Sequence, residues 1–127
     1  MKFRFDPRKR LVVVIAELEG PSGKMFVRLA LDTGTTYTLI SSSLLVAVGY
    51  DPAASVGRVE ITTASSVEYA VQLPVSRLKA LGQERQGFPV LAHSLPSSAS
   101  VDGLLGLDFF RGYSLSIDFR TSEIELD

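Results

Sequence analysis

The chain has 127 residues, of which 46% are hydrophobic and 21% charged, and a formal net charge of −1. These values fit one globular domain over residues 1–127 and exclude a disordered chain. A net charge this close to zero gives no reason to expect nucleic acid as a partner. The sequence contains no cysteine, which excludes disulfides and thiolate metal sites.

The N-terminus is basic, and its excess charge is typical of a solvated terminal arm. An apolar run follows, but Glu17 and Glu19 interrupt it and no small-residue cleavage site appears. A secretory signal peptide is therefore not expected. No run of about 18 apolar residues predicts a membrane-spanning segment. These features favour a cytoplasmic location.

Apolar runs rich in β-branched residues, separated by turn residues, predict a mostly β chain. The expected strands cover residues 11–18, 24–31, 36–40, 58–62, 67–73, 75–80, 88–92, 113–119 and 123–126. Short helices are expected over residues 44–48, after three serines that offer N-cap hydroxyls, and over residues 107–111. Residues 81–87 are interpreted as a polar turn. Four aromatic side chains are expected in the core: Phe109, Phe110, Tyr113 and Phe119.

Asp32, Thr33 and Gly34 form the most informative segment. The tripeptide follows an apolar strand-like run and precedes another, and it occurs once in the sequence. On its own it is more simply read as a turn aspartate that caps its own loop. A second segment, Leu104-Leu105-Gly106, lies downstream just before the second predicted helix. The two segments together point away from an ordinary turn.

This pair of segments resembles the retropepsin-like aspartic proteases, and residues 103–110 are similar to the version found in bacterial members. The resemblance implies an all-β fold with one or two short helices. It also implies a closed acid-protease barrel with a ψ-loop, equivalent to half of a pepsin, which pairs as a two-fold homodimer. The implied activity is that of an aspartic endopeptidase, in which the Asp32 carboxylates of two subunits activate one water. No cofactor is implied.

The resemblance also assigns roles around Asp32. Gly34 allows a tight turn that brings its N–H to the carboxylate. Thr33 is expected to reach the partner copy, and Thr35 to donate its hydroxyl to Asp32. Leu104, Leu105 and Gly106 are expected to pass the loop in the ψ-shaped crossing. Residues 2–5 and 123–126 are the expected terminal strands of the dimer interface.

The candidate flap, which would close over an extended peptide or an unfolded protein substrate, consists of Thr62, Thr63, Ala64, Ser65 and Ser66. Viral flaps bend at glycines, whereas this segment has none. The apolar subsites implied by the resemblance would favour hydrophobic residues around the cleaved bond. Activity should peak at acidic pH, because one carboxyl of the pair must stay protonated.

The sequence departs from the viral pattern after Gly106, where Leu107 replaces an arginine, although Asp108 occupies the acidic position. Asp102, Asp108 and Asp118 are interpreted as turn, cap and surface residues. His93 is the single histidine, so neither a catalytic triad nor a histidine metal cluster is expected. A retropepsin-like dimerisation or peptide-binding module with weak or no catalysis remains the alternative function.

Overall fold

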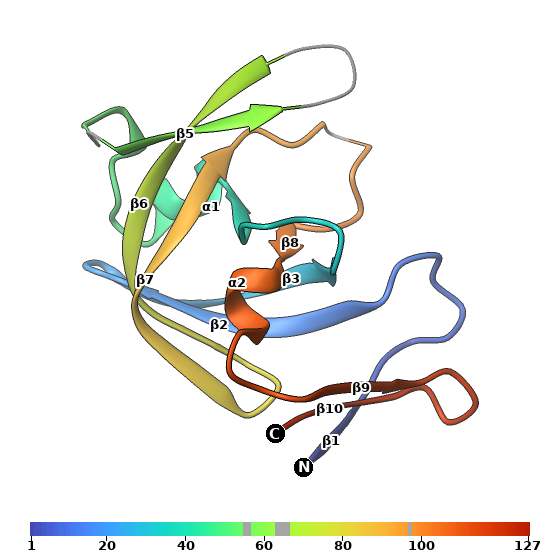
Figure 1. Cartoon of the computed structure of the whole chain (residues 1–127). Coiled ribbons are helices and arrows are strands. Elements are labelled where there is room, and N and C mark those ends of the chain that lie inside the picture. Colours follow the sequence, from blue (N-terminus) through green and yellow to red (C-terminus); the bar gives the residue numbers. More distant parts are fainter. Residues whose placement is uncertain (55–56, 63–66, 97) are drawn as a thin grey trace.

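The computed structural model describes residues 1–54, 57–62, 67–96 and 98–127 (Figure 1). Its strands are β1 (Lys2–Arg4), β2 (Val13–Gly20), β3 (Gly23–Leu31), β4 (Leu39–Ser41), β5 (Gly57–Thr62), β6 (Val67–Ala80), β7 (Gln83–His93), β8 (Gly103–Leu105), β9 (Leu115–Asp118) and β10 (Glu123–Leu126). The helices are α1 (Ser42–Ala47), the 3-10 turn η1 (Pro52–Ala54) and α2 (Leu107–Phe110).

The larger sheet closes into a barrel. Its strands follow the order β2, β3, β8, β4, β7 and β6, and β6 pairs again with β2, where Leu18 lies opposite Leu78. β5 is bonded to β6 outside this ring and forms a hairpin with it. The predicted all-β class with a closed barrel and few short helices is therefore confirmed.

Alternating side chains fill the barrel. Val14, Ala16 and Leu18 of β2 are buried, whereas Ile15 between them is exposed, as expected for strands with one face on a core. Phe109 of α2 packs edge-on against Phe88 of β7. The core is thus built from both ends of the chain.

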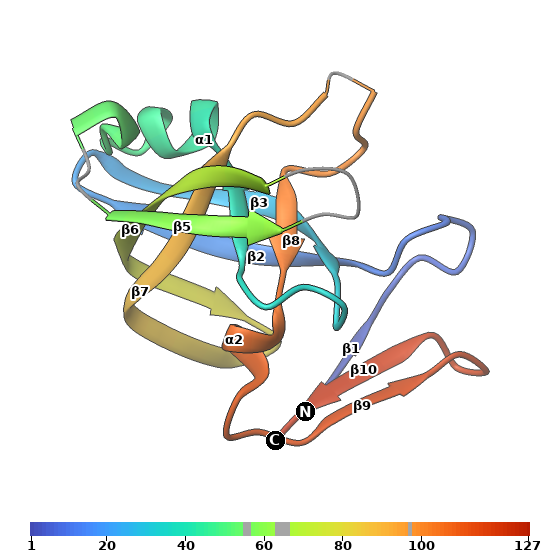
Figure 2. The same cartoon turned by 45° about the horizontal axis from the view of Figure 1, so that its top comes forward.

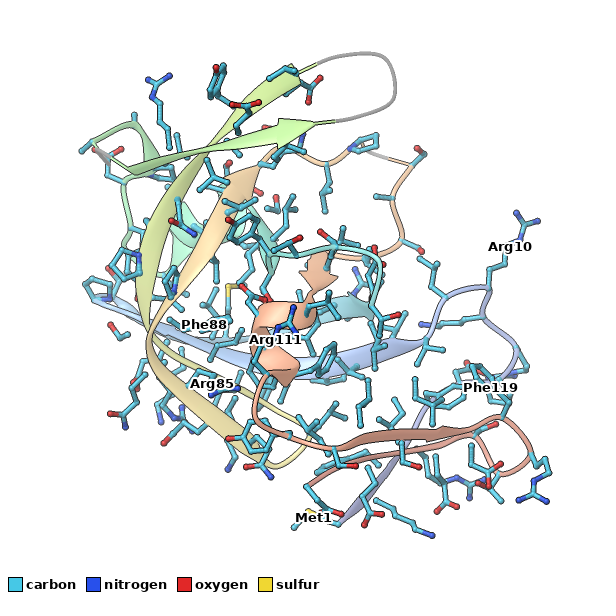
Figure 3. All side chains as sticks on the ribbon, viewed as in Figure 1. Met1, Arg10, Arg85, Phe88, Arg111 and Phe119 are labelled. Atoms are coloured by element: carbon cyan, nitrogen blue, oxygen red, sulfur yellow. The ribbon has the colours of Figure 1, made fainter. Side chains whose placement is uncertain are left out.

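Of the four aromatic residues predicted in the core, Phe109 and Phe110 are buried and Tyr113 packs against the core. The prediction for Phe119 is wrong, because its side chain is 72% exposed. It follows β9 directly and contacts Phe5 edge-on at the turn of the terminal sheet (Figure 3). The predicted strand over residues 113–119 is correspondingly shorter, since β9 spans Leu115–Asp118.

Strands β6 and β7 are longer than predicted. The strands predicted over residues 67–73 and 75–80 are one strand, and Pro74 between them lies inside β6 opposite Pro89. β6 has left β5 after Gln72 and reaches β2 only at Arg77, so the missing N–H of Pro74 interrupts no pairing on that side.

Two further sequence interpretations are corrected by local geometry. The polar turn expected over residues 81–87 contracts to Leu81 and Gly82, which both have positive φ angles, and the residues after them belong to β7. α1 begins at Ser42 without a side-chain cap, because the Ser41 hydroxyl is bonded to the Ser43 hydroxyl.

A second, three-stranded sheet stands apart from the barrel. Figure 2 shows β1, β10 and β9 side by side, with both chain termini at this sheet. β10 is the central strand and pairs with β1 and β9 of the same chain. The predicted terminal strands thus do form a sheet, although their part in a dimer stays a prediction. In the described ranges, no helix has the length and apolar character needed to cross a membrane.

Candidate active site

The Asp32 loop lies at a crossing of three strands. It leaves the end of β3 and returns as β4, and β8 runs between these two strands (Figure 1). β8 pairs in parallel with β3, with Leu31 opposite Leu105, and antiparallel with β4, with Leu39 opposite Leu104. This is the predicted ψ-loop, and it brings two distant sequence segments together.

Backbone hydrogen bonds fix Asp32. Its own N–H donates to the carbonyl of Leu105 at 3.0 Å, and the N–H of Gly34 donates to its carboxylate Oδ1 at 2.9 Å. A Cβ atom on residue 34 would lie 3.1 Å from the same oxygen, a tight contact, so a glycine suits this position. The carboxylate of half-buried Asp32 is therefore oriented by its own loop.

A hydrogen-bond network anchors the loop to α2. Asp108 accepts hydrogen bonds from the backbone N–H of Thr38 at 3.0 Å and from its hydroxyl at 2.7 Å. The Thr38 hydroxyl in turn accepts the N–H of Gly106 at 3.1 Å. The N–H groups of Leu107 and Asp108 donate to the carbonyls of Thr35 and Thr36. Sequence reasoning missed Thr38 and interpreted Asp108 only as a turn, cap or surface residue. The occurrence of Asp108 at the acidic position after Gly106 was the sequence signal that could have identified this anchoring role.

Gly106 marks the closest approach between the two segments. A Cβ atom there would lie 2.7 Å from the carbonyl carbon and oxygen of Tyr37, closer than side chains tolerate. Leu105 beside it is fully buried, and Leu104 lines a cleft next to the Asp32 loop. All three residues of the predicted apolar-apolar-glycine segment thus lie against the Asp32 loop.

Arg85 of β7 holds the other end of α2. Its Nη2 donates to the carbonyls of Phe109 and Arg111 at 2.8 and 2.6 Å. Its guanidinium also lies over the Tyr113 ring, 4.8 Å from the centroid. Figure 3 shows Arg85 and Arg111 near this helix. A cation at the end of a helix satisfies carbonyls that have no partner within the helix.

Two of the loop threonines, Thr33 and Thr35, were predicted to support the site, and their surroundings differ. Thr33 is exposed, and its expected contact with a partner copy stays a prediction. The Thr35 hydroxyl donates to the carbonyl of Tyr37 at 3.4 Å, whereas the sequence predicted a bond to Asp32. The hydroxyl thus stabilises the turn of the loop in the single chain.

A cleft of about 390 Å³ opens beside the loop. Loop residues 34–37 form one wall, and the β5–β6 hairpin contributes Ile61, Glu60 and Glu68. Leu39, Leu91 and Leu104 supply an apolar floor, and His93 lies at the border. Asp32 itself does not line the cleft, which reaches the loop at Gly34, two positions further along the chain.

The candidate flap is described only at its base. Thr62 ends β5 and pairs with Val67 at the start of β6, so a hairpin stands where the flap is expected. Thr63, Ala64, Ser65 and Ser66 lie outside the described residues. Their role as the flap tip stays a prediction.

Asp102 and Asp118 have hydrogen-bond partners away from the Asp32 loop. Asp102 accepts the N–H of Arg28 at 2.7 Å, and Asp118 is paired with Arg120. The Arg120 hydrogen bond holds the pKa of Asp118 below its ordinary range. Within the ranges that the structure describes, no three acidic or histidine side chains gather as a metal site requires.

The sequence profile of the aspartyl protease family matches residues 14–109. The chain belongs to the aspartyl protease family. The matched range includes both the Asp32 loop and the segment that crosses it. No curated protein matches this chain in sequence.

A crystal structure of a retropepsin-like aspartic protease from Rickettsia conorii is similar to this aspartyl protease chain, with a TM-score of 0.72. The alignment covers 99% of this chain and 88% of the Rickettsia chain at 16% sequence identity. At this identity the comparison shows a shared fold. Together with the family match, it confirms the predicted resemblance to retropepsin-like proteases.

Proposed function

We propose that this chain is an aspartic endopeptidase that acts as a homodimer, with one Asp32 carboxylate contributed by each subunit. The observation that carries the proposal is the placement of Asp32 at the ψ-crossing, where the N–H of Gly34 fixes one carboxylate oxygen. A cleft of about 390 Å³ lies beside this loop and is lined by Gly34 and Thr35. The family match to residues 14–109 supports the same chemistry.

Two carboxylates divide the reaction between them. The ionised carboxylate takes a proton from water, and the protonated one polarises the scissile carbonyl. Two carboxylates held close together cannot both ionise readily, so the pair shares a proton and titrates as a unit. The Asp-Thr-Gly tripeptide occurs once per chain. A two-fold axis through this loop would supply the second carboxylate.

Two features support pairing of the chains. Thr33 is exposed next to Asp32, where a second copy of the loop would have to approach. β1 and β9 are the outer strands of the terminal sheet, and outer strands can pair with strands of another chain. In the proposed dimer, the substrate lies extended in the cleft along the β5–β6 hairpin and forms strand-like hydrogen bonds.

The test combines activity with assembly. The purified chain is incubated at mildly acidic pH with an unfolded protein, with and without a statine-type transition-state mimic, and its mass is measured by sedimentation. The proposal predicts a dimer whose cleavage is blocked by the mimic and abolished in Asp32→Asn. Asp51→Asn, at an exposed aspartate before η1, is the matched control and should cleave normally. A dimer that never cleaves would instead indicate the inactive module.

A further inference from the structure

The described lining of the cleft contains two carboxylates and one histidine. Glu60 and Glu68 border it, and its described lining contains no lysine or arginine. The floor between them and the Asp32 loop is apolar, formed by Leu39, Leu91 and Leu104. A side chain that fits this cleft must therefore match an apolar base and an acidic border.

The strand register distinguishes the two glutamates. Glu68 lies opposite Ile61 and Glu60 opposite Tyr69, and residues directly opposite each other share a face of the sheet. Ala70, which shares the face of Glu68, is 4% exposed, whereas Tyr69 is 67% exposed. Glu68 and Ile61 thus lie on the hairpin face turned toward the core and the cleft. Glu60 lies on the opposite face of the hairpin and meets the cleft at its border.

We propose that Glu68 makes this cleft selective for a lysine or arginine side chain of the peptide substrate, an inference that rests on the proposed endopeptidase function. The aliphatic stem of such a side chain packs on the leucine floor and Ile61, while its charged end reaches the Glu68 carboxylate at the open side. The sequence resemblance alone implied apolar subsites that favour hydrophobic residues around the cleaved bond. The acidic border changes that expectation.

Paired peptides isolate the charge. Each pair differs only in lysine or its uncharged analogue norleucine, placed in turn at each position flanking the cleaved bond. Exposed ion pairs are weak, so the lysine peptide should have a kcat/KM about two- to fivefold higher at one or more positions. The measurement is made at the highest pH at which cleavage occurs. Added salt should reduce the preference.

Two variants assign the preference to one carboxylate. In Glu68→Gln the lysine and norleucine peptides should be cleaved equally well, whereas Glu60→Gln should retain the lysine preference. Equal cleavage of both peptides by the unmodified chain at every position would overturn the inference. So would a preference that survives in Glu68→Gln.

Binding separates this inference from the proposed function. The Asp32→Asn variant should bind the same labelled peptides without cleaving them, and fluorescence polarisation measures this binding. Asp32→Asn should bind the lysine peptide more tightly than the norleucine peptide. The Asp32→Asn, Glu68→Gln double variant should bind both equally. If no peptide is cleaved but this binding pattern appears, the endopeptidase proposal fails and the cleft assignment stands. If cleavage occurs without any lysine preference, only the cleft assignment fails.

Discussion

The hydroxyl of Thr38 donates a 2.7 Å hydrogen bond to Asp108, a residue 70 positions later in the chain. Thr38 is fully buried, and the same hydroxyl accepts the N–H of Gly106. One side chain therefore joins the Asp32 loop to both the crossing strand and α2. In the proposed enzyme, this link supports the loop that carries Asp32.

Replacing Thr38 by valine keeps the shape of the side chain but removes the hydroxyl. The N–H of Gly106 is then buried without its partner, and Asp108 loses one donor. We expect the free energy of unfolding to fall by about 1–3 kcal/mol, together with a decrease in kcat/KM. Chemical denaturation and peptide cleavage measure the two effects.

Thr38→Ser, which retains the hydroxyl, should lose less stability than Thr38→Val. Thr36→Val is the matched control, because Thr36 lies on the exposed side of the same loop. An equal loss of stability in Thr36→Val and Thr38→Val would contradict the role assigned to the buried hydroxyl.

Gly106→Ala tests the close approach of the two backbones. The added methyl would meet the carbonyl of Tyr37 at 2.7 Å, and backbone atoms cannot rotate away as a side chain can. We expect a loss of about 1–3 kcal/mol in unfolding free energy and reduced cleavage. Gly87→Asn is the control, since residue 87 has φ +57° with no atom within 4 Å of a built Cβ, and asparagine tolerates that conformation. A stable, fully active Gly106→Ala would contradict the crossing geometry.

The Asp32 region was predictable because the segments 32–34 and 104–106 together resemble a known family. A tight turn with an N–H close to a carboxylate needs a glycine at position 34, and two crossing backbones need one at position 106. In the structure the requirement is strict at position 106, where a Cβ would lie 2.7 Å from the Tyr37 backbone, whereas at position 34 it would make a tight contact of 3.1 Å with the carboxylate. Thr38 was missed because a buried threonine in a loop has no sequence pattern of its own. Its importance comes from Asp108, which only the fold brings near.

Strand pairing between distant parts of the chain explains why the predictions for the strands around Pro74 and for Phe119 were wrong. Pro74 suggests a strand boundary in the sequence, but β6 continues through it because its neighbours change from β5 to β2 at that point. Phe119 resembles a core aromatic, but β9 ends one residue earlier, and the exposed ring lies at the turn. Neither the change of partner nor the end of a short strand can be read from local composition.

Arg77 should make stability depend on pH. It hydrogen-bonds Glu17 across the β2–β6 seam and Glu84 on β7, and these bonds hold the pKa of each glutamate below its ordinary value. A carboxyl whose pKa is lower in the folded state stabilises the fold above its unfolded pKa, and this contribution is lost as pH falls through the folded pKa. Arg77→Gln should therefore unfold more easily than the original chain at pH 7.

The difference in stability between Arg77→Gln and the original chain should shrink in acid. It shrinks as pH falls below the ordinary glutamate pKa of 4.5 and through the lowered pKa values of the folded state. Denaturation midpoints from pH 7 to pH 3 measure it. Arg120→Gln is the control, because Arg120 pairs with Asp118 within one exposed turn and should change stability less. A difference that grows as pH falls would contradict the assignment.

The central claim is tested most directly by mixing subunits. Tagged Asp32→Asn is exchanged with the untagged original chain at constant total concentration, and co-purification verifies that mixed dimers form. Since a mixed dimer has one catalytic aspartate, activity should follow the square of the active fraction and fall to about one quarter in an equal mixture. Activity proportional to that fraction, about one half in the same mixture, would show that each chain acts alone and would contradict the shared site.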